Sequence, residues 1–174
     1  SYSELPQFYI DAVISVEDYR FENHCGIDLI AIGRAMLTDI KKHSFIQGGS
    51  TITQQLAKNM LFTQEKKLER KVAEVFAALE LECNYSKEDI FELYVNTSYF
   101  GNGYYGVREA ADGYFGKTFS ELSAMLAGIP NAPSVYSPNA VNESTARRVE
   151  CVLESIVKNR IISQEQAYNI EMEQ

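Results

Sequence analysis

The helical spacing of apolar residues is the feature that most constrains the fold of this chain. In "EKKLERKVAEVFAALELEC" (65–83), apolar residues recur with helical spacing and form one stripe, made of Leu68, Val72, Val75, Phe76, Leu79 and Cys83. Further helices are predicted over 5–18, 27–42, 51–62, 86–96, 107–116, 119–129 and 144–170. Strand signals are few and short, so the sequence predicts one mainly α domain over residues 1–174.

Glycine and proline mark the expected connections. Gly48 and Gly49 break the chain, and "PNAPSVYSP" (130–138) is expected to be a loop because proline cannot continue a helix. "GNGYYG" (101–106) matches the dinucleotide-binding pattern GxGxxG, but that reading requires a preceding strand, and the preceding segment has helical spacing. We therefore interpret 97–106 as a loop shaped by permissive glycines.

Composition excludes several classes of function. The net charge of −8 argues against nucleic acid as the main partner, although a local basic cluster could still bind an anion. No run of about 18 apolar residues is present, so no transmembrane helix is predicted. Cys25, Cys83 and Cys151 form no CxxC pair and are expected to be buried free thiols. His24 and His43 are too few for a histidine-rich metal site.

The first candidate site is Glu17, which with Asp18 follows the apolar run "AVISV". A helix C-terminus disfavours acids because the macrodipole is negative there. Glu17 is then either an exposed terminal acid or a functional group, and partial burial would suit it to act as a general base near neutral pH.

The second candidate is "GGSTITQQLAKN" (48–59), a glycine turn followed by a helix start. Thr51 and Gln54 have capping-box spacing. A capped polar helix explains the pattern, and an anion or sugar site at the helix start explains it too. The hydrogen-bonding residues at this end are Ser50, Thr51, Thr53, Gln54, Gln55, Lys58 and Asn59.

The third candidate lies on the helix over 65–83, where Lys67, Arg70, Lys71 and Glu74 cluster opposite the apolar stripe. Arg70 and Lys71 are both within one helical turn of Glu74. A solvated ladder of ion pairs is one interpretation. The alternative is a covered groove, because alanines share this face, and such a groove would suit a diphosphate.

These blocks, in this order, resemble the peptidoglycan glycosyltransferase family, glycosyltransferase family 51. "EDYRFENHCGID", "GGSTITQQLAKN", "RKVAEVFAALELE", "ELYVNTSYFGNGYYGVREAADGYFGK" and "LAGIPNAPSVYSP" resemble its five motifs. The family includes monofunctional enzymes and the glycosyltransferase domains of class A penicillin-binding proteins. The terminal helices show no linker, which favours a monofunctional parent.

The resemblance implies a reaction and a set of roles. Glu17 would be the general base that activates the 4-hydroxyl of lipid II, which attacks the growing glycan with inversion and release of undecaprenyl diphosphate. Glu74 would be the second catalytic carboxylate, acting directly or through a divalent cation (Mg²⁺ or Mn²⁺). The implied substrate-binding residues are Asp18, Phe21, His24, Ser50, Thr51, Gln54, Gln55, Lys58, Asn59, Arg70 and Lys71.

The resemblance also implies a lysozyme-like fold with a small membrane-proximal lobe, expected over 29–45. The protein is expected at the extracytoplasmic face of a bacterial cell membrane, through an N-terminal anchor missing from this chain. Its implied partners are lipid II, the growing glycan, the membrane surface, moenomycin-type inhibitors and other cell-wall synthesis proteins.

Two other functions remain open. A lytic enzyme of lysozyme type would use Glu17 as a general acid and would not need Lys58, Arg70 and Lys71 beside a second carboxylate. A non-catalytic module would bind membrane lipid diphosphates without turnover.

Overall fold

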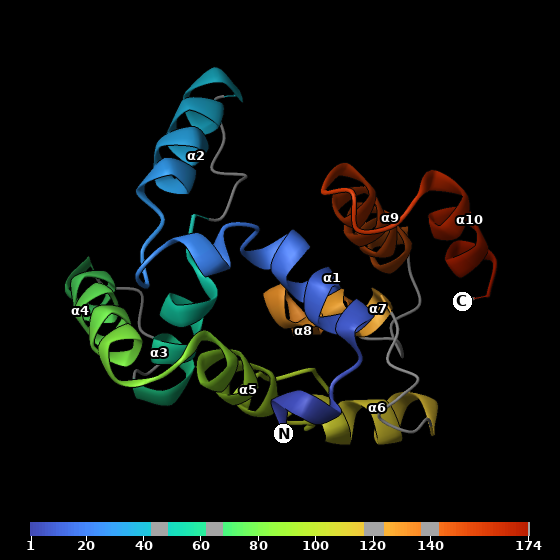
Figure 1. Cartoon of the computed structure of the whole chain (residues 1–174), viewed down its shortest axis with the longest axis horizontal. Helices are drawn as coiled ribbons and strands as arrows, with labels where there is room; N and C mark the ends of the chain where they lie inside the picture. Colours follow the sequence, from blue (N-terminus) through green and yellow to red (C-terminus); the bar gives the residue numbers. More distant parts are fainter. Residues whose placement is uncertain (43–48, 62–67, 117–123, 137–142, 174) are drawn as a thin grey trace. The chain divides into compact units, whose positions relative to one another are not determined.

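The computed structural model describes residues 1–42, 49–61, 68–116, 124–136 and 143–173, and these are overwhelmingly helical (Figure 1). The α-helices are α1 (Gln7–Glu17), α2 (Leu29–Lys42), α3 (Ile52–Leu61), α4 (Leu68–Asn84), α5 (Lys87–Thr97), α6 (Val107–Phe115), α7 (Ala124–Gly128), α8 (Pro133–Tyr136), α9 (Glu143–Lys158) and α10 (Gln164–Glu173). Short 3-10 turns are η1 (Tyr2–Glu4), η2 (Phe21–Asn23) and η4 (Ile129–Asn131). The mainly α fold class is confirmed, and the described residues contain an isolated bridge between Tyr99 and Tyr105 in place of a sheet.

The chain divides into two compact units, each held by its own helix packing. The first comprises Ser1–Tyr19 and Val95–Gln174, and the second comprises Arg20–Tyr94. The prediction of a single domain over 1–174 stays a prediction.

In the first unit, α1 packs on α7 and α9 (Figure 1). The inward face of α1 buries Tyr9 and Val13 completely, and α9 contributes Val152 and Ile156 to the same core. Apolar burial of this kind stabilises the unit by roughly 1.5–3 kcal/mol for each large side chain. Helix α1 is therefore fixed along its length, including the end that carries Glu17.

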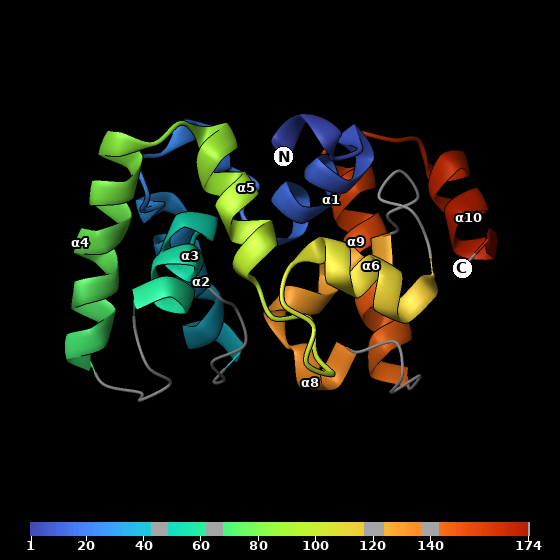
Figure 2. The same ribbon diagram turned by 90° about the horizontal axis from the view of Figure 1, so that it is seen from below.

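In the second unit, α3 packs on α4, as Figure 2 shows. Ile52 and Leu56 of α3 are fully buried, as are Ala78 of α4 and Ile90 of α5. This core brings the start of α3 next to the first half of α4, where the predicted basic cluster lies.

The buried face of α4 differs from the simplest reading of its pattern. Phe76, on the apolar stripe, is 67% exposed, and Val72 and Leu79 are exposed as well. On the opposite face, Glu74 and Ala78 are buried. The carboxylate of the charged face thus points into the unit, so this face is not a fully solvated ladder of ion pairs. The groove suited to a diphosphate stays a prediction.

Within the segment 130–138, the described residues 130–136 are more ordered than expected. Residues Pro133–Tyr136 form α8, where the sequence predicts a loop. Pro133 is the first helical residue, a position whose N–H has no intrahelical acceptor, so proline is tolerated there. The N–H of Val135 and that of Tyr136 both donate to the carbonyl of Ala132.

The cysteine prediction is wrong. Cys25, Cys83 and Cys151 are free, but all three are exposed. Cys25 and Cys151 each lie beside a buried position rather than on it: Gly26 is packed against α4 next to Cys25, and Val152 is buried next to Cys151. The general tendency of free cysteines to be buried does not distinguish a buried position from the exposed position next to it.

The expected lobe over 29–45 is described in its first part. Leu29 and Ile30 of α2 are exposed, whereas Ala35 is buried. Residues 31 and 32 are half-buried and residues 33 and 34 are exposed, whereas the side chains of residues 36–45 lie outside the described part of the chain. Among the described ranges, none of the helices combines the length and apolar character needed to cross a lipid bilayer.

Candidate functional site

Glu17 is the last residue of α1, and its side chain is only 2% exposed. Buried Asp18 follows it and closes the helix, its N–H donating to the carbonyl of Ile14 at 3.0 Å. A buried carboxylate at a negative helix end requires a cation. Arg148 of α9 supplies one, because its Nη2 lies 2.6 Å from Oε1 of Glu17. The interpretation of Glu17 as an exposed terminal acid is therefore wrong.

Arg148 is itself held on two further sides. Its Nε donates to the carbonyl oxygen of Gly128 at 3.1 Å, and its guanidinium carbon lies 5.5 Å from the ring centroid of Tyr136. A Cβ at position 128 would lie 3.0 Å from Cγ of Arg148 and 3.3 Å from Val152, so glycine allows this close approach. The segment around Gly128 and Tyr136 thus orients the arginine that orients Glu17.

Arg148 is not among the residues predicted from the sequence. A signal was present: Thr145, Val152 and Ile156 form the buried face of α9, and Arg148 lies on that face four residues before Val152. An arginine on an apolar helix face needs a buried partner. Its neighbour Arg147 instead pairs with Glu143, with both side chains exposed.

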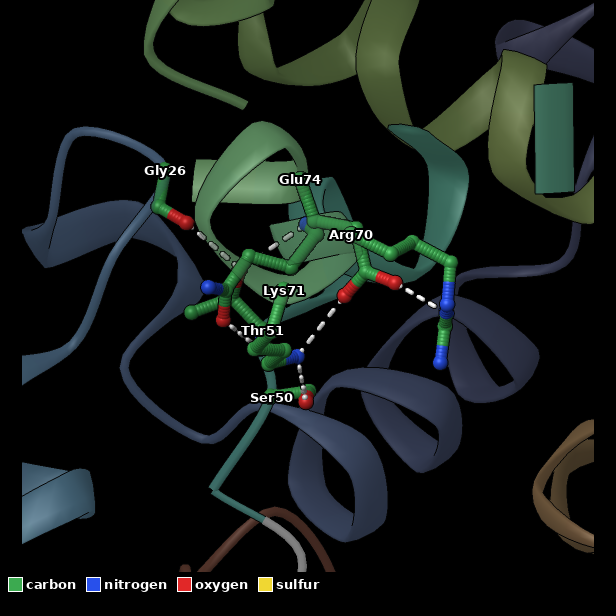
Figure 3. Close-up of polar contacts among 7 residues, drawn as sticks. Gly26, Ser50, Thr51, Arg70, Lys71 and Glu74 are labelled. Atoms are coloured by element: carbon green, nitrogen blue, oxygen red, sulfur yellow. Dashed lines mark hydrogen bonds and ion pairs between the residues drawn. The ribbon is translucent and has the colours of Figure 1, made fainter. Parts of the chain in front are cut away.

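The second buried carboxylate is Glu74 of α4, with a side chain 1% exposed (Figure 3). Arg70 pairs with its Oε1, and Nζ of Lys71 lies 2.9 Å from its Oε2. Lys71 also donates to Oγ of Ser50 at 2.8 Å. The four residues, Ser50, Arg70, Lys71 and Glu74, form a cluster that we call the basic cluster.

The basic cluster carries one net positive charge, since two cations share one carboxylate. Lys71 is 45% exposed along its side chain, and Arg70 is partly exposed, so both cations can reach a ligand while Glu74 holds them from below. Planar guanidinium and compact ammonium groups are the usual protein partners of phosphate oxygens. The arrangement is suited to an anion with several oxygens.

The start of α3 has the predicted capping box. The N–H of Gln54 donates to Oγ1 of Thr51, and the N–H of Thr51 donates to Oε1 of Gln54, each at 3.1 Å. Thr51 Oγ1–H also donates to the carbonyl of Gly26 at 2.6 Å, as Figure 3 shows. Thr51 and Gln54 are thus buried and support the helix start, and their predicted role in substrate binding stays a prediction.

The other predicted residues of α3 are more dispersed. Oε1 of Gln55 accepts a hydrogen bond from the hydroxyl of Tyr94 at 3.3 Å. Lys58 lies in the last turn of the helix, half-buried, and Asn59 is exposed. Ser50 is the predicted residue of this segment that joins the basic cluster directly.

Phe21 and His24 lie in the turn that follows α1. The Phe21 ring is buried and meets the His24 ring edge-on, with the centroids 6.2 Å apart. Nδ1 of His24 accepts a hydrogen bond from the N–H of Gly26 at 3.2 Å, within the same turn. Gly26 has φ +84°, and a Cβ there would lie 2.8 Å from the carbonyl oxygen of Ala78. The turn is therefore packed directly on α4.

The predicted residues fall into two groups, one in each compact unit. Glu17 and Asp18 belong to the first unit, and the remaining predicted residues belong to the second. Each group is internally well defined, and the roles assigned to the two groups stay predictions.

A divalent cation at Glu74 does not fit the residues present. Both carboxylate oxygens already accept from cationic side chains, and the described residues contain no cluster of three His, Cys, Asp or Glu side chains. Mg²⁺ is usually bound by one or two carboxylates together with waters and substrate phosphates. In this structure each oxygen of Glu74 faces a protein cation instead.

Comparison with known proteins agrees with these features. A family model described as transglycosylase matches residues 1–157. Penicillin-binding protein 1A of Aquifex aeolicus is 43% identical over 170 residues, which is 95% of this chain and 23% of that protein. Penicillin-binding protein 1F of Bacillus subtilis is 43% identical over 171 residues, or 96% of this chain and 24% of that protein. The chain thus spans about a quarter of the length of these relatives.

A crystal structure of penicillin-binding protein 1A from Haemophilus influenzae aligns with a TM-score of 0.44 and 24% identity, over 71% of this chain and 16% of that one. The fold described above rests on the chain's own helices and not on this similarity. The family assignment rests on the family-model match, which extends over most of the chain and includes Glu17, Glu74 and Arg148. The chain belongs to the transglycosylase family, glycosyltransferase family 51.

Proposed function

We propose that this chain is a peptidoglycan glycosyltransferase that polymerises lipid II into β-1,4-linked glycan. The observation that carries the proposal is the buried carboxylate of Glu17, held through one oxygen by Arg148 at the end of α1. A general base must keep a fixed orientation toward the proton that it removes. The support from α9 and from Gly128 gives Glu17 that fixed orientation.

In the proposed reaction, Glu17 takes the proton of the 4-hydroxyl on the N-acetylglucosamine of lipid II. The hydroxyl oxygen forms a bond to the anomeric carbon of the growing glycan, whose bond to the diphosphate breaks. The bonding electrons leave with undecaprenyl diphosphate, and attack from the opposite side inverts the anomeric configuration. Repetition on the same strand would make the enzyme processive.

The basic cluster supports the departure of the diphosphate. A leaving group of this kind needs neutralisation of charge more than covalent assistance, and preorganised cations supply it without reorganisation. Arg70 and Lys71 are held in place by buried Glu74 and by Ser50, and Lys58 would add a third cation from α3. Glu74 acts here as the organiser of the cations.

A resident Mg²⁺ or Mn²⁺ has no step in this reaction, because Glu74 is fully paired. A cation that stimulates the enzyme would have to arrive with the diphosphate. Polymerisation measured with and without a chelator tests this directly.

We further propose that the chain acts at the extracytoplasmic face of a bacterial membrane, where its lipid-linked substrate resides. The exposed Leu29 and Ile30 at the start of α2, close to Arg34, give this region an apolar surface beside a cation. Such a surface is suited to a lipid interface. Cosedimentation with vesicles that contain anionic lipid, compared between the wild type and Leu29→Ser, tests this.

One experiment separates the proposed function from its two rivals. The chain is incubated in parallel with lipid II and with preformed glycan, and the products are resolved by size. Polymer from lipid II supports the proposal. Cleavage of the glycan would show a lytic enzyme, and binding of lipid II without any product would show a non-catalytic module. A moenomycin-type phosphoglycolipid should block polymer formation by competing for the basic cluster, and its failure to do so would remove the cluster from the substrate site.

A further inference from the structure

Lys87, the first residue of α5, makes two contacts with the turn that carries Phe21 and His24 and a third with α4. Its Nζ donates to the backbone carbonyl of His24 at 2.7 Å and lies 4.5 Å from the ring centroid of Phe21. Nζ also lies 2.8 Å from Oε1 of Glu82 near the end of α4. The ammonium group is thus divided between a carbonyl, an aromatic face and a carboxylate, and it lies largely buried.

Glu82 extends these contacts to α3. Its Oε1 also accepts a hydrogen bond from Oγ1 of Thr53, which is fully buried, at 2.6 Å. Gly26 lies against the same side chain, since a Cβ there would be 3.2 Å from Cγ of Glu82. Lys87 and Glu82 therefore link the turn to α3, α4 and α5 at once.

This arrangement is more specific than a stabilising ion pair requires. A surface pair is worth little, and a buried pair is often no better than apolar residues of the same volume. Here Lys87 and Thr53 both donate directional hydrogen bonds to Glu82, and Lys87 also donates to the backbone carbonyl of His24 itself. The Phe21 ring contacts the Lys87 ammonium, the His24 ring and the Phe91 ring. The ring centroids of Phe21 and Phe91 lie 6.3 Å apart.

We propose that Lys87, supported by Glu82, is a positioning residue that fixes the Phe21–His24 turn on α4, so that the turn presents His24 to the lipid-linked substrate in one orientation. The proposal rests on the proposed function in so far as the substrate is a lipid-linked sugar diphosphate. The geometric part, the fixing of the turn, stands independently of any activity.

The geometric part is tested by nuclear magnetic resonance of the histidine rings. The chain contains two histidines, His24 and His43, so selective labelling gives two ring signals, and His43→Gln assigns them. The edge-on Phe21 ring should displace the His24 signal in the wild type. In Lys87→Met, which keeps the apolar stem and removes the ammonium, the signal should move to the position of a free histidine. Lys158→Met, a change at an exposed lysine of α9, should leave it in place.

The functional part is tested by steady-state kinetics with lipid II. Lys87→Met should raise KM about tenfold, which corresponds to about 1.4 kcal/mol of binding. The value of kcat should change much less, and Lys87→Arg should recover part of the loss because a cation is restored. A merely structural role would lower the active fraction, and so reduce the apparent kcat without changing KM.

The outcomes are distinct. A His24 signal and a KM that both stay at wild-type values in Lys87→Met would overturn the proposal, as would a loss confined to kcat. If the wild type makes no polymer, the proposed function fails, and the histidine signal alone then decides whether Lys87 fixes the turn. If the His24 signal then still moves in Lys87→Met, Lys87 fixes the turn, and the ligand that the turn serves is a different one.

Discussion

Replacing Arg148 by methionine would leave the buried Glu17 carboxylate without its cation. The pair is short, with 2.6 Å between Nη2 of Arg148 and Oε1 of Glu17, and both side chains are largely buried. Methionine keeps the length and the apolar character of the arginine stem. The substitution therefore isolates the loss of the guanidinium from the loss of packing.

The expected cost follows from the geometry. At 2.6 Å and an effective dielectric constant of about 20, the gross attraction between unit charges is roughly 6 kcal/mol, much of it offset by the loss of hydration of both groups. Removing one partner of such a buried pair typically costs about 3–5 kcal/mol. In a chain of 174 residues this lowers Tm by roughly 10 °C. The carbonyl of Gly128 also loses its donor, which adds to the cost.

The assay is urea unfolding followed by circular dichroism at pH 7, with Arg147→Met as the matched control. Arg147 is the adjacent residue of α9 and pairs with Glu143 in full exposure, so its loss should change the free energy of unfolding by less than about 0.5 kcal/mol. The double variant Arg148→Met/Glu17→Gln should recover a large part of the lost stability, since no charge is then left unpaired. A free energy of unfolding for Arg148→Met within about 0.5 kcal/mol of the wild type would refute the buried pair.

Three further predictions concern other buried polar groups. Among the described residues, the buried hydroxyl of Tyr9 has no hydrogen-bond partner, and burial together with the charge of Glu17 raises the pKa of this phenol well above its usual range. Tyr9→Phe should therefore match or exceed the wild-type stability by up to about 1 kcal/mol, and a loss of more than that would show that the hydroxyl is bonded. Burial alone would raise the pKa of Asp28, but the N–H of Ala31, the cation of Arg20 and further contacts outweigh it and hold the pKa below the ordinary 3.8. Asp28 then contributes stability above about pH 4 that is lost as the pH falls through the lowered pKa, so unfolding measured from pH 7 to pH 2 should show a weaker acid dependence for Asp28→Asn; an identical dependence would contradict this. Glu74→Gln should leave the cations of the basic cluster unanchored and weaken the handling of lipid II in the polymerisation assay, and wild-type rates in this variant would contradict its assignment.

The helices of this chain are readable from the sequence because most of them are amphipathic. The predicted range 65–83 becomes α4 at Leu68–Asn84, and 86–96 becomes α5 at Lys87–Thr97. The capping box of Thr51 and Gln54 likewise appears as expected, because its two hydrogen bonds are local and depend only on residues three apart. Local chemistry of this kind needs no knowledge of the tertiary fold.

Which face of a helix is buried depends on what packs against it, and there the sequence misleads. On α4 the apolar stripe suggests that Phe76 is buried, yet Phe76 is exposed and Glu74 is buried. The inward face is made of small residues such as Ala78, onto which Gly26 packs closely. The spacing of large apolar residues on α4 does not show that the backbone at Gly26 packs against the opposite face, where only small side chains leave room for it.

The partners of the two carboxylates show the same limit. The partners of Glu74 are its helical neighbours Arg70 and Lys71, and the i,i+3 and i,i+4 spacing predicts both. Glu17 is paired instead with Arg148, far along the chain, and no local rule connects them. Lys87 and its contact with His24 are non-local in the same way.

Glu17→Gln in a lipid II polymerisation assay tests the proposed chemistry most directly, provided that the free energy of unfolding is measured on the same preparation. Glutamine preserves the shape of the side chain and a hydrogen-bond acceptor for Arg148 but cannot take a proton. The account predicts a variant that remains folded and loses about 10²- to 10⁴-fold in polymerisation rate. A folded Glu17→Gln protein that polymerises lipid II at the wild-type rate would contradict the account.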